Sequence, residues 1–207
     1  MHNFKETKLD SNILKAIAEM GFKTPTPIQA KTIPHLMTSN LDLIATAQTG
    51  TGKTAAFGLP SIHLTDLKYK DTQTLVLCPT RELCIQIAKD IANYSKYLNG
   101  INILAVYGGS DIKTQIKSLN KGAHIVIGTP GRTKDLIKRK KLNISRIARI
   151  ILDEADEMLT MGFKEDLEMI LSHTPKEKQT LLFSATMSKK VVAITESYMK
   201  NPQKIAA

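Results

Sequence analysis

Short apolar runs alternate with longer amphipathic segments along this sequence, and that alternation constrains the fold more than any other feature. Strands are expected at residues 42–45, 74–78, 101–106, 124–127, 149–152 and 180–183. Helices are expected at residues 11–20, 27–37, 53–67, 82–98, 112–120, 133–138, 163–172 and 189–200. Because several of the strands are almost wholly apolar, the pattern predicts an α/β fold with a mostly parallel sheet and helices on both faces.

The size and charge of the chain narrow the class of protein. Its 207 residues, 42% hydrophobic and 23% charged, suit one soluble globular domain with a sizeable core. Lysine and arginine number 29 against 19 aspartate and glutamate, which gives a net charge of +10. This excess favours a polyanionic partner, most commonly nucleic acid, and a generally basic enzyme is an equal alternative.

Cysteine usage and hydropathy bear on location. Cys78 and Cys84 are the only cysteines, and their spacing fits neither a disulfide scaffold nor a zinc site. The first ten residues lack the apolar segment of a secretory signal, and no apolar stretch approaches the roughly 20 residues that span a bilayer. We therefore expect a cytoplasmic protein without a membrane partner.

A glycine-rich segment, Ala47 to Thr54, reads Ala-Gln-Thr-Gly-Thr-Gly-Lys-Thr and lies between a predicted strand and a predicted helix. Glycines let backbone N–H groups approach phosphates, and the N-terminus of the following helix adds positive partial charge. In such a loop Lys53 reaches the outer phosphates and the Thr54 hydroxyl ligates magnesium. The alternative is a glycine turn with a chance Lys-Thr pair, which these neighbours disfavour.

An acidic motif, Asp153-Glu154-Ala155-Asp156, follows a predicted buried strand. Asp153 is placed to hold magnesium, directly or through water, and Glu154 to orient or deprotonate the attacking water. Alone, the motif is better explained as an acidic helix N-terminus that complements the helix dipole. Together with the phosphate loop it predicts nucleotide hydrolysis, with Glu154, Asp153 and Lys53 as catalytic residues and Thr54 and Asp153 as the Mg²⁺ ligands.

The chain resembles the first RecA-like domain of bacterial DEAD-box ATP-dependent RNA helicases over essentially its whole length. The motifs that carry the resemblance, in order, are Gly21 to Gln29, Ala47 to Thr54, Pro79 to Leu83, Gly108-Gly109, Thr129 to Arg132, Asp153 to Asp156 and Ser184 to Thr186. The resemblance implies a RecA-like P-loop NTPase domain over residues 1–207 that uses ATP and Mg²⁺ and binds RNA. Ala47, where the general phosphate-loop pattern has glycine, is normal in this family.

The resemblance gives a role to residues 21–29, the family's Q motif, which selects adenine. The Gln29 carboxamide can donate to and accept from adenine at once, and Phe4 matches the upstream aromatic residue that packs on the adenine ring. Without the resemblance, Gln29 is read as a capping or solvent-facing amide and Phe4 as a core residue. The implied nucleotide-binding residues are Phe4, Phe22, Thr24, Gln29, Thr49, Gly50, Thr51, Gly52, Lys53 and Thr54.

Three further motifs resemble the family's RNA-facing segments. Their hydroxyls, exposed glycine amides and arginines suit phosphate and sugar contacts, which carry no sequence information. The 2′-hydroxyl is the natural discriminator of RNA against DNA. In the alternative reading the arginines are surface ion-pair partners and the glycines are turn residues. The implied RNA-binding residues are Pro79, Thr80, Arg81, Gly109, Thr129, Gly131 and Arg132.

Ser184 and Thr186 resemble the motif that couples hydrolysis to unwinding. Their hydroxyls can hydrogen-bond Asp156 and transmit a nucleotide-dependent shift, while helix capping is the alternative. Cys84 stands where the family usually has alanine.

Two further segments can each be interpreted in two ways. Thr133-Lys134 stand where apolar residues are usual, and they either add a phosphate contact or face solvent. The basic run Lys138 to Lys141 is either a solvated loop or an extension of the RNA footprint.

The family carries a second RecA-like domain with an arginine finger, and nothing in residues 1–207 corresponds to it. We therefore expect this chain to be the first domain of a longer protein, and by itself to hydrolyse ATP barely. Two competing hypotheses are an RNA-binding module with a vestigial nucleotide site and a nucleotide-driven enzyme acting on DNA. The intact phosphate loop and acidic motif disfavour the former, and the Q motif and the Asp-Glu-Ala-Asp spelling disfavour the latter.

Overall fold

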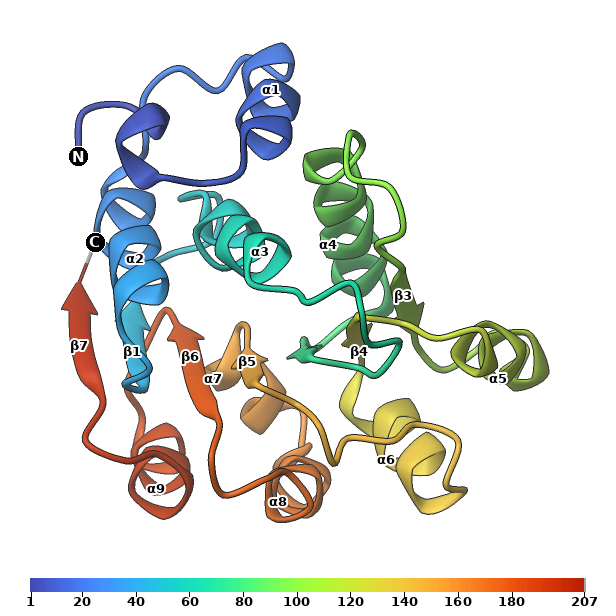
Figure 1. Cartoon of the computed structure of the whole chain (residues 1–207). Coiled ribbons are helices and arrows are strands. Elements are labelled where there is room, and N and C mark those ends of the chain that lie inside the picture. Colours follow the sequence, from blue (N-terminus) through green and yellow to red (C-terminus); the bar gives the residue numbers. More distant parts are fainter. Residues whose placement is uncertain (207) are drawn as a thin grey trace.

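A computed structural model describes residues 1–206 of the chain (Figure 1). The helices are η1 (Phe4–Thr7, a 3₁₀ turn), α1 (Ser11–Glu19), α2 (Pro27–Thr38), α3 (Lys53–His63), α4 (Arg81–Tyr94), α5 (Ile112–Asn120), α6 (Pro130–Lys138), α7 (Ala155–Thr160), α8 (Lys164–Ser172) and α9 (Lys189–Tyr198). The strands are β1 (Leu43–Thr46), β2 (Thr74–Leu77), β3 (Ile103–Val106), β4 (Ile125–Gly128), β5 (Arg149–Leu152), β6 (Gln179–Ser184) and β7 (Gln203–Ala206).

The strands form a single sheet in the order β3-β4-β2-β5-β6-β1-β7, and every neighbouring pair is parallel. Figure 1 shows α1 to α4 on one side of the sheet and α6, α8 and α9 on the other. Each face has its own cluster of buried apolar side chains, one packed by α1 to α4 and the other by α6 to α9. The predicted α/β fold is confirmed, and the sheet is parallel throughout its described strands.

The strand order sorts the motifs into two neighbouring groups at one edge of the sheet. Because β5, β6 and β1 are adjacent, the acidic motif, the Ser-Ala-Thr motif and the phosphate loop, which follow them, lie side by side. Similarly, β3, β4 and β2 are adjacent, and they precede the three motifs expected to face RNA. The pairing of β2 with β5 joins the two groups.

Three elements were not expected from the sequence, namely the short turn η1, strand β7 and helix α7. Strand β7 pairs with β1 at the sheet edge, although only Ile205 among its residues is buried. Helix α7 has six residues and follows directly from the acidic motif. Helix α3 ends at His63, four residues earlier than predicted, and α4 ends at Tyr94 rather than at residue 98. Within residues 1–206, no helix combines the length and the apolarity that a membrane crossing demands.

Candidate functional site

A cavity of about 320 Å³ lies where the phosphate loop, the acidic motif and the Ser-Ala-Thr motif meet. It is lined by Thr49, Lys53, Glu154, Asp156, Glu157, Thr160, Ala185 and Thr186. These residues come from three segments that are far apart in the sequence and are brought together by the adjacent strands β1, β5 and β6. The structure therefore brings to one cavity four side chains that the sequence assigned to hydrolysis and coupling, namely Lys53, Glu154, Asp156 and Thr186.

The centre of this site is a buried cation between two carboxylates. Lys53 Nζ lies 3.5 Å from Asp153 Oδ1 and 3.8 Å from Glu154 Oε1. The relative exposure of Lys53 is 6% and that of Asp153 is 2%. Burial raises the pKa of the Asp153 carboxyl to about 6, against the opposing effect of the Lys53 ammonium. Because these charged groups lie away from water, an anion or cation bound beside them would interact strongly with all three.

Glu154 is held in a fixed position beside this pair. Its backbone adopts a left-handed conformation, φ 53°, where the chain turns from β5 into α7. Its Oε1 accepts a hydrogen bond of 3.0 Å from the Thr49 hydroxyl, and its N–H donates to Asp153 Oδ1 at 3.0 Å. A non-glycine residue in this conformation is uncommon, and such outliers cluster at functional sites. The carboxylate is thereby aimed at the cavity from a strained turn.

Glu157 lines the same cavity, and the sequence did not single it out. A shared hydrogen bond with Glu154, together with burial, raises the pKa of the Glu157 carboxyl. The signal that could have found it is spacing, because residues three apart on a helix share a face.

The phosphate loop depends on two glycines in left-handed conformations, Gly50 with φ 82° and Gly52 with φ 90°. A Cβ at Gly52 would stand 2.5 Å from Gln29 Nε2, so a side chain there has no room. Thr51 closes the loop by donating its hydroxyl to the Gln48 carbonyl at 2.7 Å. Helix α3 begins at Lys53, within the last two residues of the loop, so the free N–H groups of its first turn can donate to phosphate oxygens.

Gln29 connects the Q motif to the phosphate loop. Its Oε1 accepts from the Thr26 N–H at 2.9 Å, and its Nε2 donates to the Gly52 carbonyl at 3.1 Å. The side chain is buried, and the capping reading is present in the structure. One Nε2 proton and one Oε1 lone pair remain available, so adenine recognition by Gln29 stays a prediction that these contacts permit.

A separate cavity of about 360 Å³ lies beside the two predicted adenine-facing aromatic residues. Phe4 is buried, and its ring centroid lies 5.9 Å from that of Phe22. Both line the cavity together with Leu14, Ile17 and other residues of the N-terminal segments. Neither the phosphate loop nor Gln29 lines it, and Thr24 is exposed outside both cavities. The structure thus places the aromatic residues apart from the cavity beside the phosphate loop, and their contact with a base stays a prediction.

Asp156 is joined to the Ser-Ala-Thr motif by a closed set of hydrogen bonds. Its Oδ2 accepts from the Thr186 N–H at 3.0 Å and from the Thr186 hydroxyl at 2.8 Å. Its N–H donates to Ser184 Oγ, and the Ser184 hydroxyl donates to the Thr186 carbonyl at 2.7 Å. Partial burial raises the pKa of Asp156, but the hydrogen bonds from Thr186 and Ser184 outweigh it and hold the pKa below its ordinary value.

The residues expected to face RNA form a second polar group after β2, β3 and β4. Thr80 caps α4, with its hydroxyl oxygen accepting from the Leu83 N–H at 3.2 Å. The Arg81 guanidinium lies over the Tyr107 ring, 5.1 Å from its centroid. A Cβ at Gly109 would come 3.7 Å from Arg81 Nη1, which shows how closely the loop and the arginine approach. Pro79 is buried, while Thr129 and Gly131 are half-buried at the start of α6.

Arg132 makes two hydrogen bonds within the protein. Its Nη1 donates to Gln115 Oε1 at 2.9 Å and its Nη2 donates to the Ser110 carbonyl at 3.1 Å. Gln115 in turn donates to the Tyr107 carbonyl at 3.1 Å. Arg132 therefore orients the loop of residues 107–110, and neither it nor Arg81 has a carboxylate partner within residues 1–206. Sequence reasoning missed Gln115 and Tyr107, because their roles arise only from tertiary contacts.

Both readings of Thr133 were wrong. It neither contacts phosphate nor faces solvent, because it is fully buried against Gly128, where an added Cβ would clash with its Oγ1. Lys134 forms an ion pair with Asp166 of α8. Cys84 is buried, with Sγ 3.2 Å from the Ile127 carbonyl, so it takes the place of alanine in the core under β4.

Comparisons with known proteins agree with this geometry. A family profile described as DEAD/DEAH box helicase matches residues 26–194. The ATP-dependent RNA helicase CshA of Listeria monocytogenes is 52% identical over 99% of this chain, which covers 39% of that protein. The ATP-dependent RNA helicase DeaD of Escherichia coli is 46% identical over 98% of the chain, which covers 32% of that protein.

Two solved structures resemble the fold closely. A DEAD box protein from the hyperthermophile Methanococcus jannaschii has a TM-score of 0.96 at 45% identity, over all of this chain and 56% of that one. A hypothetical ATP-dependent RNA helicase from Sulfolobus tokodaii has a TM-score of 0.87 at 39% identity, over 96% and 57% of the two chains. This chain therefore spans about a third to two fifths of the curated relatives described above and somewhat more than half of the solved chains.

Proposed function

The chain belongs to the DEAD/DEAH box helicase family, and from that premise we propose that it is the ATP-binding core domain of an ATP-dependent RNA helicase. The observation that carries the proposal is the cavity where the phosphate loop, the acidic motif and the Ser-Ala-Thr motif meet. Membership of the family implies that the chain uses a nucleotide. We propose that this nucleotide is ATP. The two named relatives are bacterial RNA helicases, which favours a cytoplasmic location.

The residues around the cavity have separate roles in ATP hydrolysis. Backbone N–H groups of residues 49–54 and the N-terminus of α3 bind the phosphates. Lys53 leaves its carboxylate partners, which lie 3.5 and 3.8 Å away, to contact the outer phosphates. Glu154, fixed by the Thr49 hydroxyl, orients the attacking water and accepts its proton.

The donors beside Lys53 suit magnesium. Asp153 is a buried carboxylate, and Thr54 presents a hydroxyl in the first turn of α3. One or two carboxylate or hydroxyl oxygens together with substrate phosphates are the usual ligands of Mg²⁺ at nucleotide sites. When bound, the ion neutralises charge on the phosphate oxygens. Asp153 and Thr54 would hold it, and its charge would keep Asp153 ionised despite burial.

Coupling to RNA is assigned to the second group of residues. Arg81, Gly109 and Arg132 supply donors for phosphate and sugar oxygens, and such contacts do not read sequence. Asp156 links the catalytic turn to Thr186 through two hydrogen bonds, so a shift of α7 on hydrolysis reaches the Ser-Ala-Thr motif. We assign the unwinding step to cooperation with a second RecA-like domain, which the greater length of the relatives accommodates.

The test compares this chain alone with a protein that joins it to a second RecA-like domain. An arginine finger contributes about 10³–10⁵ in rate, so we expect RNA-stimulated ATP hydrolysis from the joined protein and almost none from the chain alone. Near-equal RNA-stimulated rates from both proteins would refute the need for a second domain. No hydrolysis by either protein, with or without RNA, would refute the assigned activity.

A further inference from the structure

The positive charge of this chain is concentrated in one short segment. Residues 111–146 hold ten lysines and arginines against two aspartates, whereas the remaining chain holds 19 basic against 17 acidic residues. Nearly all of the net charge of +10 therefore comes from α5, β4, α6 and the connection to β5. A generally basic protein would spread its charge, so this distribution points to a local anionic partner.

Six lysines of this segment form an unpaired basic surface, which we call the basic shoulder. They are Lys113, Lys117, Lys121, Lys138, Lys140 and Lys141. All six are exposed, and within residues 1–206 none has a carboxylate at ion-pair distance. By contrast, Arg139 and Lys134 in the same segment are paired, with Asp135 and Asp166. Among the described residues 1–206, the fold thus pairs some cations of this segment and leaves these six without a carboxylate partner.

The lysines after α6 lie in an ordered turn rather than in a loose loop. The N–H of Lys140 donates to the Ile137 carbonyl at 2.9 Å, and that of Lys141 donates to the Leu136 carbonyl at 2.9 Å. Lys140 has φ 56°, a left-handed conformation that ends helices and strongly favours glycine. A cation therefore occupies a position where glycine would suit the backbone better.

Helix stabilisation does not explain every lysine of α5. Lys113, Lys117 and Lys121 are spaced by four residues, which puts them along one side of the helix. Lys113 lies in the first turn, where the helix dipole disfavours a positive charge. Lys117 lies in the last turn and Lys121 caps the helix, where the dipole favours cations, so Lys113 is the lysine of this row that the helix itself does not explain.

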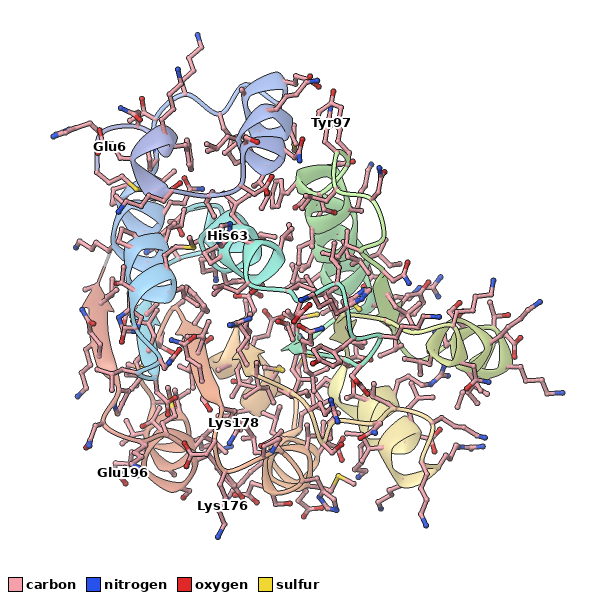
Figure 2. The ribbon with its side chains drawn as sticks, in the orientation of Figure 1. Glu6, His63, Tyr97, Lys176, Lys178 and Glu196 are labelled. Atoms are coloured by element: carbon pink, nitrogen blue, oxygen red, sulfur yellow. The ribbon has the colours of Figure 1, made fainter. Side chains whose placement is uncertain are left out.

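The two rows of lysines belong to one region, which begins at the residues assigned to RNA. Leu119 of α5 lines a small cavity of about 130 Å³ together with Lys141 and Lys70. In Figure 2, nitrogen-tipped side chains project outward from α5 and α6 at the same margin of the molecule. Arg132 lies in the first turn of α6, and Lys138 is about 9 Å further along the helix axis. That distance corresponds to roughly three nucleotide steps of a duplex strand.

We propose that the basic shoulder binds the phosphate backbone of RNA that continues beyond the central site, by which we mean Arg81, Gly109 and Arg132. The inference rests on the proposed function and extends it, because it adds a flanking contact that lengthens the bound RNA without reading sequence. RNA is favoured over an acidic protein because α5, which carries Lys113 and Lys117, contacts Arg132 through Gln115, and because the evenly spaced lysines of α5 match a regular chain of phosphates.

The test measures the affinity of this chain for two RNAs over a range of salt concentrations. One RNA is a short single strand that fits the central site, and the other is the same strand joined to a long hairpin. The variant combines Lys138→Ala, Lys140→Ala and Lys141→Ala. A matched control combines Lys176→Ala, Lys200→Ala and Lys204→Ala, which removes the same charge from exposed positions outside the shoulder.

We expect the shoulder variant to weaken binding of the hairpin RNA and to leave binding of the short strand unchanged. Each lost duplex phosphate contact lowers the slope of log affinity against log salt by about 0.9. Three contacts therefore account for a slope of about 2.7, or roughly a 40-fold change in affinity over a fourfold change in salt. The control variant should match the unaltered chain on both RNAs.

The single substitution Lys140→Gly distinguishes a loss of RNA binding from a loss of folding. Lys140→Gly should hold or raise the melting temperature, because glycine suits the left-handed turn, and should weaken binding of the hairpin RNA. Equal binding by the shoulder and control variants would overturn the inference. So would equal losses on both RNAs, or polyglutamate competing as well as RNA. If the unaltered chain binds neither RNA at low salt, the proposed function fails as well.

Discussion

The substitution Gly52→Ala tests how the Q motif and the phosphate loop depend on one another. Gly52 has φ 90°, and a Cβ there would stand 2.5 Å from Gln29 Nε2 and 3.1 Å from Thr26 Oγ1. The new methyl group therefore cannot be accommodated unless Gln29 moves. If Gln29 moves, it loses its 3.1 Å hydrogen bond to the Gly52 carbonyl.

Two contributions set the expected loss of stability. A left-handed conformation costs an L-residue about 1–2 kcal/mol, and a lost hydrogen bond costs about 0.5–1.5 kcal/mol. Together they predict a loss of about 1.5–3.5 kcal/mol in the free energy of unfolding. For a chain of this size, each kcal/mol lowers the melting temperature by about 2–4 °C. The loss therefore corresponds to a fall of about 3–14 °C.

Gly50→Ala is the matched control, because Gly50 has φ 82° and nothing lies within 4 Å of its added Cβ. It carries the backbone strain and the change in unfolded-state entropy but not the clash. Thermal unfolding followed by circular dichroism should show Gly52→Ala melting below Gly50→Ala. Adding Gln29→Ala should make the Gly52→Ala cost approach that of the control, as a double-mutant cycle would reveal. Equal melting temperatures for the two alanine variants would refute the reasoning.

Three further predictions concern the site and the core. Thr186→Val removes the hydroxyl that donates to Asp156, so in a two-domain protein we expect unwinding to fall more than ATP hydrolysis, and equal falls in the two assays would contradict this. Lys53→Ala should weaken ATP binding in a calorimetric titration by at least about tenfold, the size of one charge-assisted hydrogen bond, and unchanged affinity would remove Lys53 from the phosphate site. His124 accepts from the Asn102 N–H, and burial lowers its pKa below the ordinary 6.5. The folded state therefore disfavours the protonated ring, so denaturant titrations should show stability falling as pH drops through about 6.5, and His124→Gln should flatten that dependence.

The alternation of apolar and amphipathic segments was enough to predict the parallel sheet and most of its helices. It could not reveal β7, because Gln203–Ala206 has one buried side chain and pairs only through its backbone with β1. Helix α7 was missed because six residues are too few for a helical period to show. The end of α3 at His63 depends on where the following chain turns back toward β2, which no residue type marks.

The site residues likewise include some that the sequence reveals and some that only the structure reveals. The phosphate loop and the acidic motif were recognisable because their chemistry depends on local order along the chain. Gln115 was not, because its role is to hold Arg132 and the Tyr107 carbonyl across two helices. The double use of Gln29 was also hidden, since the Gly52 carbonyl that it contacts is 23 residues away. Local motifs therefore predict which groups react, and tertiary contacts decide what holds them.

The role of Glu154 is tested by single-turnover hydrolysis of bound ATP in a Glu154→Gln variant of the two-domain protein. Glutamine keeps the size of the side chain and can still accept from the Thr49 hydroxyl, which lies 3.0 Å from Oε1. A general base contributes about 10²–10⁴ in rate. We predict hydrolysis slower by at least about 100-fold with ATP affinity nearly unchanged. Hydrolysis at the unaltered rate would contradict the assignment of Glu154 and, with it, the account of this site.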